Sequence, residues 1–400
     1  MWKQLSGIHS DLIEEIGHQN GFTNFAIDIK PGSAKGDNYL GLIRKLTIKS
    51  HERKFDLILK TPASSRNQKN AVPIHKIFLR EIYVYEKLFK EFKKFQNVYR
   101  ISSPFLGYPR FYGKCDRIGN ECVVLENIVE EGYKMWDRKK PMNAGHISAV
   151  LVEYAKFHAI SLALQYKNSY FYEELTKEVE TPISVSNLEN REKTEQFVKS
   201  IIDCGCKALA DDTEAVKKLR SFENLMPNYI MKDMRDPNLA IVITHGDNWC
   251  TNLMFKYEKT TNTEVPSGVC ILDWQLSKKD SPAADLACFF LMHSPKEILY
   301  DYKKYLNLYH DTVRKYLRDF ACDPEEIFPF SLLERHWKVF VKFGFLFSML
   351  GIKVMYRDSD EIVEMDQDYL QTISRDIRKS KEYKQRIKDL LEFMTDNGFI

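Results

Sequence analysis

The sequence predicts an α+β protein with two unequal lobes: a small antiparallel β-sheet lobe first, then a larger, mainly helical lobe. The chain has 400 residues, which is more than one hydrophobic core usually holds. Residues 21–60 alternate and turn as the strands of an antiparallel sheet do. From residue 141 onward, apolar side chains recur chiefly at helical spacing. The sheet is therefore expected before the helices.

Composition predicts a globular protein with no dominant charge. Hydrophobic residues make up 44% of the chain, and 25 Phe and 21 Tyr supply material for a large core. The 59 Lys and Arg nearly balance the 56 Asp and Glu, so the net charge is only +3. Such a balance gives no argument for a nucleic acid or a membrane as a partner.

The cysteines and the N-terminal residues bear on the cellular compartment of the protein. Eight cysteines are scattered along the chain, and Cys122, Cys270 and Cys288 lie in apolar runs where they would pack as small hydrophobes. Residues 1–20 carry acidic side chains among apolar ones, as an amphipathic helix does and a signal peptide does not. No window approaches the ~20 apolar residues of a membrane span. We therefore expect a reduced, soluble, cytoplasmic protein.

The most informative motif lies in the second lobe, where two strands end in polar side chains. A strand at 241–243 leads into Asp247 and Asn252, and a strand at 269–272 leads into Asp273. The turn-rich segment 259–268 between them indicates a hairpin, which brings the three side chains together. Phosphoryl transfer needs such a set: a carboxylate to orient and deprotonate a hydroxyl, and an Asn and an Asp to hold Mg²⁺ on nucleotide phosphates.

The first lobe offers a loop that would close over phosphates. Strands at 25–29 and 42–48 flank a loop with two glycines and small polar residues, whose backbone N–H groups would face the phosphates. An ordinary hairpin turn has the same composition, so the loop alone leaves both interpretations open. The candidate nucleotide-binding residues in it are Gly32, Ser33, Lys35, Gly36 and Asn38.

A lysine and a glutamate are the next candidates. Lys60 ends the strand 55–60 and is either its solvated end or the lysine that reaches the α- and β-phosphates. The second role requires a helical glutamate to orient the ammonium group. Pro73 starts a helix that carries Glu81 beside its apolar face, while Glu86 is a more exposed rival. The apolar face consists of Phe78, Ile82, Tyr85 and Phe89.

A crossover between the lobes is expected near residue 130. Strands at 111–115 and 121–126 form a hairpin, and the chain then continues through Glu126 and Ile128, whose backbone groups would hydrogen-bond adenine. We expect residues 1–130 to form the nucleotide-binding lobe with the crossover. Residues 131–400 would form the catalytic and substrate-binding lobe, with the acceptor pocket shaped by segments 165–240 and 296–400.

Five residues of the second lobe have structural interpretations. His158, on an apolar helical face, is predicted to be a hydrogen-bonded core histidine. Asp285 starts an apolar helix, where its carboxylate would cap free N–H groups and brace the catalytic loop. His245 would support the same loop. Pro227 and Pro237 are expected to break the helices ahead of the strand at 241.

These motifs resemble the aminoglycoside phosphotransferase and choline kinase superfamily, and more closely its ecdysteroid kinase-like (CHK kinase-like) family. That family shows His-Gly-Asp-x-Trp, Asp-Phe/Trp-Gln and Ser-Pro-x-x-Asp-Leu segments. The matching residues here are His245-Gly246-Asp247, Asp273-Trp274-Gln275 and Ser281-Pro282-Ala283-Ala284-Asp285, with Lys60, Glu81 and segment 155–159 as further matches. The resemblance covers about residues 25–390.

The resemblance implies a two-lobed protein-kinase-like fold and ATP-dependent phosphorylation of a small-molecule hydroxyl, with ecdysteroids as the named substrate. It implies that Asp247 is the catalytic base and that Asn252 and Asp273 are Mg²⁺ ligands. It implies Lys60 and Glu81 as the phosphate-anchoring pair and residues 32–39 as the nucleotide loop. Two departures, Cys250-Thr251 before Asn252 and Asn127 in place of an acid, bear on nucleotide or substrate preference.

Other classes of function are weighed against this one. A protein kinase is disfavoured because His-Gly-Asp replaces His-Arg-Asp, Asp273-Trp274-Gln275 lacks the flexible glycine, and no Ala-Pro-Glu segment follows. A non-catalytic ligand-binding pseudokinase would be expected to lose Asp247, Asn252, Asp273 or Lys60, and all four are present. A xenobiotic or choline-like acceptor remains an alternative to a steroid.

Overall fold

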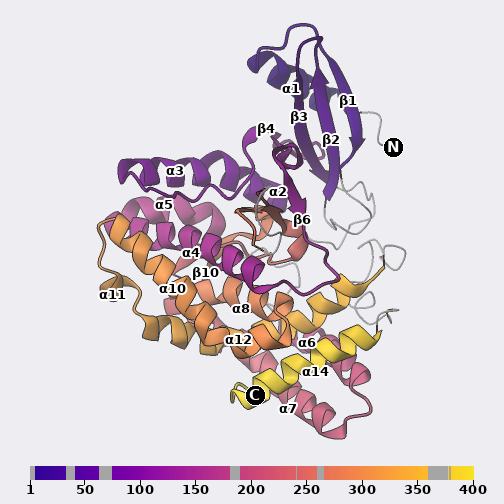
Figure 1. Ribbon diagram of the computed structural model, residues 1–400, viewed down its shortest axis with the longest axis vertical. Helices are drawn as coiled ribbons and strands as arrows, with labels where there is room; N and C mark the ends of the chain where they lie inside the picture. The colour runs from indigo at the N-terminus through magenta and orange to yellow at the C-terminus, as the bar shows by residue number, and fades with distance from the viewer. Residues whose placement is uncertain are drawn as a thin grey trace.

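The computed structural model describes residues 5–32, 41–62, 74–180, 190–239, 241–258, 265–358, 377 and 380–400. A small β-sheet lobe stands at one end, and a larger helical lobe fills the other, where the C-terminus lies beside helices α7 and α14 (Figure 1). The predicted α+β fold, with an antiparallel N-terminal sheet and a mainly helical C-terminal lobe, is confirmed.

The N-terminal lobe is a five-stranded antiparallel sheet in the order β1-β2-β3-β5-β4. Helix α1 (Gly7–Gln19) packs on it through buried Ile13 and Ile16. In the register, Lys60 of the third strand lies between Ile43 and Val123 of its neighbours. This central position places the lysine far from an exposed sheet edge. The strands are β1 (Ala26–Pro31), β2 (Gly41–Lys49), β3 (Lys54–Pro62), β4 (Phe111–Cys115) and β5 (Cys122–Glu126).

The helix expected after residue 73 is present, with an irregular turn inside it. α2 (Ile74–Tyr83) passes through one π-helical turn (Val84–Leu88) into α3 (Phe89–Val98). The four apolar residues of the predicted face are all buried, and Glu81 is buried with them. Apolar spacing therefore located the helix and the side that faces the core.

Short strands around the crossover belong to the second lobe. After β5, a 3₁₀ turn (Ile128–Glu131) leads to β6 (Tyr133–Met135), which pairs with β8 (Leu253–Lys256). β8 also pairs with β9 (Gly268–Ile271), so a hairpin is present, but its first strand is β8 and not the predicted strand at 241–243. The chain has thus joined the strands of the second lobe by Tyr133, while a boundary at residue 130 stays a prediction. The remaining pair is β7 (Val242–Thr244) with β10 (Lys278–Asp280).

Two helices cross at the centre of the C-terminal lobe. α8 packs against the long α12, and Gly344 of α12 lies so close to Ala287 of α8 that an added Cβ would be 2.8 Å from its backbone. The helices of this lobe are α4 (Ala144–Lys167), α5 (Ser169–Glu180), α6 (Arg191–Ala208), α7 (Thr213–Met231), α8 (Pro282–His293), α9 (Lys296–Tyr300), α10 (Tyr302–Asp319), α11 (Pro324–Ile327), α12 (Phe330–Tyr356) and α14 (Ser380–Asp396).

Two sequence predictions about these helices need correction. Pro227 does not break α7, which continues through it to Met231. The proline is buried, and the apolar side of α7 (Phe222, Met226, Ile230) packs into the core, which offsets one lost backbone hydrogen bond. Pro237 does mark a break, since a short 3₁₀ turn starts there.

The second correction concerns membrane-spanning potential. By length and composition alone, Ala144–Lys167 (mean hydropathy 1.4) and Pro324–Tyr356 (mean hydropathy 1.6) could each cross a membrane. In both, 72% of the most apolar window is buried inside the protein. Burial of that extent is what core helices show, and it accounts for their hydrophobicity.

Candidate active site

The predicted catalytic loop, residues 245–252, follows β7 and turns sharply at Gly246. Gly246 has φ +80°, and a Cβ there would lie 2.5 Å from the Leu276 carbonyl oxygen, so only glycine fits. The turn directs Asp247 toward Asn252, whose Nδ2 donates to both Oδ2 and the carbonyl oxygen of Asp247 at 3.0 Å. These two predicted site residues are therefore in direct contact.

The hairpin carries Asp273 to the same place. The Leu272 N–H donates to the Asn252 carbonyl at 2.8 Å, which joins the end of β9 to the catalytic loop. Asp273 itself has φ +64°, a left-handed conformation that is costly for a residue with a side chain. Strain of this kind is held in place by surrounding contacts and is common at functional sites.

Lys60 joins the two lobes electrostatically. Its Nζ lies 2.7 Å from Glu81 Oε2 and 2.6 Å from Asp273 Oδ1, with all three groups largely buried. Burial alone would lower the pKa of Lys60, but the charges of Asp273 and Glu81 raise it above its ordinary value. The rival Glu86 is instead bound to Lys114 at 2.8 Å.

Two carboxyl groups of the site, those of Asp247 and Glu81, have a raised pKa. Burial first, and then the charge of Asp273, raises the pKa of Asp247 to about 7. Burial also raises the pKa of Glu81 to about 7, although the ammonium group of Lys60 opposes this. Burial is the main cause of both shifts, and the charge of Asp273 adds to it, because like charges in a poorly solvated site resist simultaneous ionisation. Asp247 is thereby tuned toward the range of a general base.

His245 holds the loop as a neutral ring. Burial lowers its pKa. Its Nε2 lies 2.8 Å from the Leu272 carbonyl oxygen, while its Nδ1 accepts the Asp247 N–H at 3.3 Å. A neutral tautomer with the proton on Nε2 satisfies both contacts. His245 therefore connects the catalytic loop to the strand that ends at Asp273.

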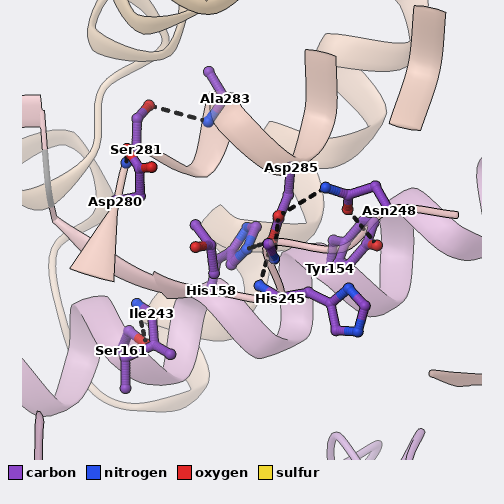
Figure 2. Close-up of polar contacts among 12 residues, drawn as sticks. Tyr154, His158, Ser161, Ile243, His245, Asn248, Asp280, Ser281, Ala283 and Asp285 are labelled. Carbon is purple, nitrogen blue, oxygen red and sulfur yellow. Dashed lines mark hydrogen bonds and ion pairs between the residues drawn. The ribbon is translucent and has the colours of Figure 1, made fainter. Parts of the chain in front are cut away.

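Asp285 lies beneath the loop, and its role differs in one respect from the prediction. The cap of α8 is the Ser281 hydroxyl, which accepts the Ala283 N–H. The Asp285 carboxylate points instead at the catalytic loop, where it accepts the N–H group of His245 at 2.7 Å (Figure 2) and that of Gly246 at 3.0 Å. A serine at the N-cap leaves the carboxylate one turn later free for this task.

His158 takes the core position expected of it. It is buried, with Nε2 3.2 Å from Asp285 Oδ2 and Nδ1 2.9 Å from the Tyr309 hydroxyl. Although burial alone would raise the pKa of Asp285, hydrogen bonds lower it below its ordinary value, first that of His158 and then that of the Gly246 N–H. The carboxylate is therefore ionised and a strong acceptor.

A cleft of about 840 Å³, open to solvent, lies between the sheet and the β8–β9 hairpin. A concave, largely apolar cleft with a few converging polar groups is the usual form of a small-molecule site. The predicted site residues that line it are Gly32, Lys60, Glu81, Glu126, Ile128, Asn252 and Asp273. Asp247 lies beyond this lining, in contact with Asn252. Ser33, Lys35, Gly36 and Asn38 lie outside the described residues.

The apolar walls of the cleft were missed by the sequence analysis. Most of the remaining lining is hydrophobic, as a base-binding site requires. Part of this lining could have been predicted from the alternation of side chains along β2 and β3, because Ile43 and Ile58 lie on the cleft side of these strands. The other lining residues are Pro109, Leu125, Asn127, Val129, Met135, Thr251, Met254 and Leu272.

The acidic and amide groups suit a magnesium ion that is bound mainly through phosphates. Among the described residues, no three His, Cys, Asp or Glu side chains are grouped to hold a metal by themselves. Mg²⁺ bound to a nucleotide typically uses one or two carboxylates and keeps waters and phosphate oxygens as its other ligands. Asp273 with the Asn252 amide oxygen fits that pattern, since only the Asn252 nitrogen donates to Asp247.

Fold and site together define a two-lobed, protein-kinase-like protein with a cleft between its lobes and clustered acidic, amide and lysine groups at one end. The chain belongs to the ecdysteroid kinase-like family, whose model matches residues 35–321, well over half of the sequence. The resemblance drawn from the motifs is thereby confirmed. A comparison with curated proteins gives no match.

Two solved structures are similar along the whole chain. One is the GDP complex of wild-type aminoglycoside 2′-phosphotransferase-IIIa, with 12% identity and a TM-score of 0.42, covering 98% of this chain and 100% of that one. The other is the GDP complex of a point mutant of the same enzyme, with 13% identity, a TM-score of 0.42, and coverage of 98% and 99%.

Proposed function

We propose that this protein is an ATP-dependent small-molecule kinase that transfers the γ-phosphate to a substrate hydroxyl. The observation that carries this proposal is the convergence of Asp247, Asn252 and Asp273 on the Lys60–Glu81 ion pair at one cleft. Each of these groups meets a requirement of phosphoryl transfer. Membership of the ecdysteroid kinase-like family supports the same reaction.

In the proposed reaction, Asp247 accepts the proton of the acceptor hydroxyl as its oxygen bonds to the γ-phosphorus. The bond from that phosphorus to the bridging oxygen breaks, and ADP leaves. Lys60, oriented by Glu81, holds the phosphates. Asn252 and Asp273 would hold Mg²⁺, which when bound neutralises phosphate charge. The raised pKa of Asp247 makes it a stronger base than an exposed aspartate.

We further propose an ecdysteroid or a related hydrophobic alcohol as the acceptor. Family membership supports this choice. A screen of hydroxylated steroids, plant metabolites and choline for ATP-dependent gain of one phosphate in mass would test it. Phosphorylation of choline or of a plant metabolite, with no steroid modified, would replace the steroid proposal and keep the kinase.

Nucleotide binding is tested most sharply by two glutamates on one continuous helix. Glu81→Gln removes one of the two carboxylate partners of Lys60 and is expected to weaken Mg·ATP binding about tenfold, because the ammonium group loses the carboxylate proposed to orient it toward the phosphates. Glu86→Gln removes only the exposed contact with Lys114 and is the matched control. Isothermal titration with Mg·ATP measures both affinities.

Two results would count against the kinase. One is equal Mg·ATP affinity in Glu81→Gln and Glu86→Gln. The other is an intact protein with neither a thermal shift on addition of Mg·ATP nor any ATP turnover. Asp273→Ala, which lacks one proposed Mg²⁺ ligand, is expected to abolish turnover.

A further inference from the structure

A single carboxylate, that of Asp285, binds the catalytic loop on both sides of Asp247. Ahead of Asp247, the carboxylate accepts the N–H groups of His245 and Gly246. After it, Asp285 Oδ1 accepts Nδ2 of Asn248 at 3.1 Å (Figure 2). His245, Gly246 and Asn248 are therefore hydrogen-bonded to Asp285, and Asp247, the proposed base, lies between them. These neighbours fix its position.

Asn248 is held at its other end as well. The hydroxyl of Tyr154, on α4, donates to Asn248 Oδ1 at 2.6 Å. Tyr154 and Asp285 are 0% exposed and Asn248 is 8% exposed, so water does not replace these bonds readily. The amide therefore uses a donor toward the carboxylate and an acceptor toward the phenol. The amide group of asparagine offers both roles at once.

We infer that Asn248 and Tyr154 act as a pair of positioning residues that fix the direction of the Asp247 carboxylate; this inference rests on the proposed role of Asp247 as the base. Asn252 contacts the carboxylate from one side, and the Asn248–Tyr154 pair fixes the backbone that follows it. A misplacement of about 1 Å in a reacting group costs on the order of 100-fold in rate. Loosening this pair should therefore lower turnover without changing nucleotide affinity.

Three variants and one control test the pair. Tyr154→Phe removes only the hydroxyl and keeps the ring that stacks on His158, with centroids 5.9 Å apart. Asn248→Ala removes the amide, and the double variant removes both. The control is Tyr229→Phe, which deletes a tyrosine hydroxyl bonded to the Val339 carbonyl on α12, away from the loop.

The first measurement is hydrolysis of Mg·ATP with water as the acceptor. Each single variant is expected to lower kcat about tenfold, with KM for ATP within about twofold of the wild type. The double variant should be no slower than Asn248→Ala, because both changes remove one coupled interaction. Tyr229→Phe should keep the wild-type kcat. Wild-type kcat in both single variants, or multiplied losses in the double variant, would overturn the inference.

The second measurement does not depend on activity. Amide hydrogen exchange of a peptide covering 241–255 should accelerate in Tyr154→Phe and Asn248→Ala and stay unchanged in Tyr229→Phe, because the loop opens more often. If the wild-type protein neither binds nor hydrolyses ATP, the proposed function fails, while this comparison still decides whether the pair holds the loop. Unchanged exchange in both variants would contradict the inference on its own.

Discussion

At the residue scale, burial and the nearby charge of Asp273 together oppose the ionisation of Asp247. Asp247 is linked through Asn252 to the loop that carries Asp273, and the charge of Asp273 adds to burial in raising its pKa. Lys60 compensates one carboxylate directly through its 2.6 Å contact with Asp273. This arrangement lowers the stability of the folded protein when no ligand is bound. The proposed Mg²⁺ and nucleotide would relieve the repulsion.

This arrangement predicts opposite effects of Asp247→Asn on stability and turnover. An unfolded aspartate titrates near 3.9, whereas the pKa of folded Asp247 is raised to about 7. The folded chain binds the extra proton between these values, so the contribution of this group is full below about pH 3.9 and lost as the pH rises through about 7. Asp247→Asn should therefore raise the melting temperature of the metal-free protein at pH 8.

The effect of Asp247→Asn on melting should shrink as the pH approaches 4, while hydrolysis of Mg·ATP falls about a thousandfold because the base is lost. Differential scanning calorimetry at both pH values, with a chelator, measures the first effect. Asp11→Asn, on the exposed side of α1, is the control and should leave both quantities unchanged. A lower melting temperature for Asp247→Asn at pH 8 would refute the charge argument.

At the scale of elements, the α8–α12 crossing depends on two glycines in α12 that meet different atoms. A Cβ on Gly344 would lie 2.8–2.9 Å from the backbone and Cβ of Ala287, whereas one on Gly351 would meet the side chain of Met292. A backbone cannot yield without moving its helix, and a methionine side chain can turn away. The two positions therefore differ in tolerance although both are helical glycines.

Gly344→Ala should lower the unfolding free energy by about 1–3 kcal/mol through overpacking, which exceeds the gain of about 1 kcal/mol that alanine brings to a helix interior. Gly351→Ala should lie close to the wild type or slightly above it. Urea unfolding of both variants measures the difference. Equal destabilisation of the two would show that the backbone contact at Ala287 is not what limits the crossing.

Helices and strands were predictable from the sequence where the spacing of apolar residues matches the side of the element that packs into the core. The spacing of Phe78, Ile82, Tyr85 and Phe89 located α2 and its buried side, and the turn-rich segment located the β8–β9 hairpin. The pattern failed at Pro227, because the tertiary packing of α7 outweighs the local preference of proline.

At the scale of the molecule, the parts of the site that were missed depend on contacts between distant segments. Nothing near Asp285 in the sequence indicates that its carboxylate binds Gly246 and Asn248 rather than its own helix end. The cleft walls likewise combine Ile43 and Ile58 of one lobe with Met254 and Leu272 of the other. The residue types indicated phosphoryl transfer. Which side chains face one another across the cleft is defined only when the two lobes are assembled.

The C-terminal lobe also carries a buried histidine where several segments join. His293 ends α8, its Nδ1 donates to the Phe289 carbonyl at 2.8 Å, and its own carbonyl accepts the Met142 N–H. Arg386 of α14 binds the flanking carbonyls of Met292 and Ser294. Burial, with a smaller contribution from the charge of Arg386, lowers the pKa of His293 to about 4.

An unfolded histidine titrates near 6.5, so between about pH 6.5 and 4 the unfolded chain binds a proton that folded His293 does not. Stability should consequently fall with acidification in this window, by about 2 kcal/mol at pH 5 from this residue.

His293→Asn keeps an amide donor for Phe289 and does not titrate. Between pH 7 and pH 5, the unfolding free energy of this variant, measured with urea, should decrease by about 2 kcal/mol less than that of the wild type. His51→Asn, at an exposed turn, should follow the wild type. Parallel losses in His293→Asn and the wild type would mean that the junction tolerates a protonated histidine.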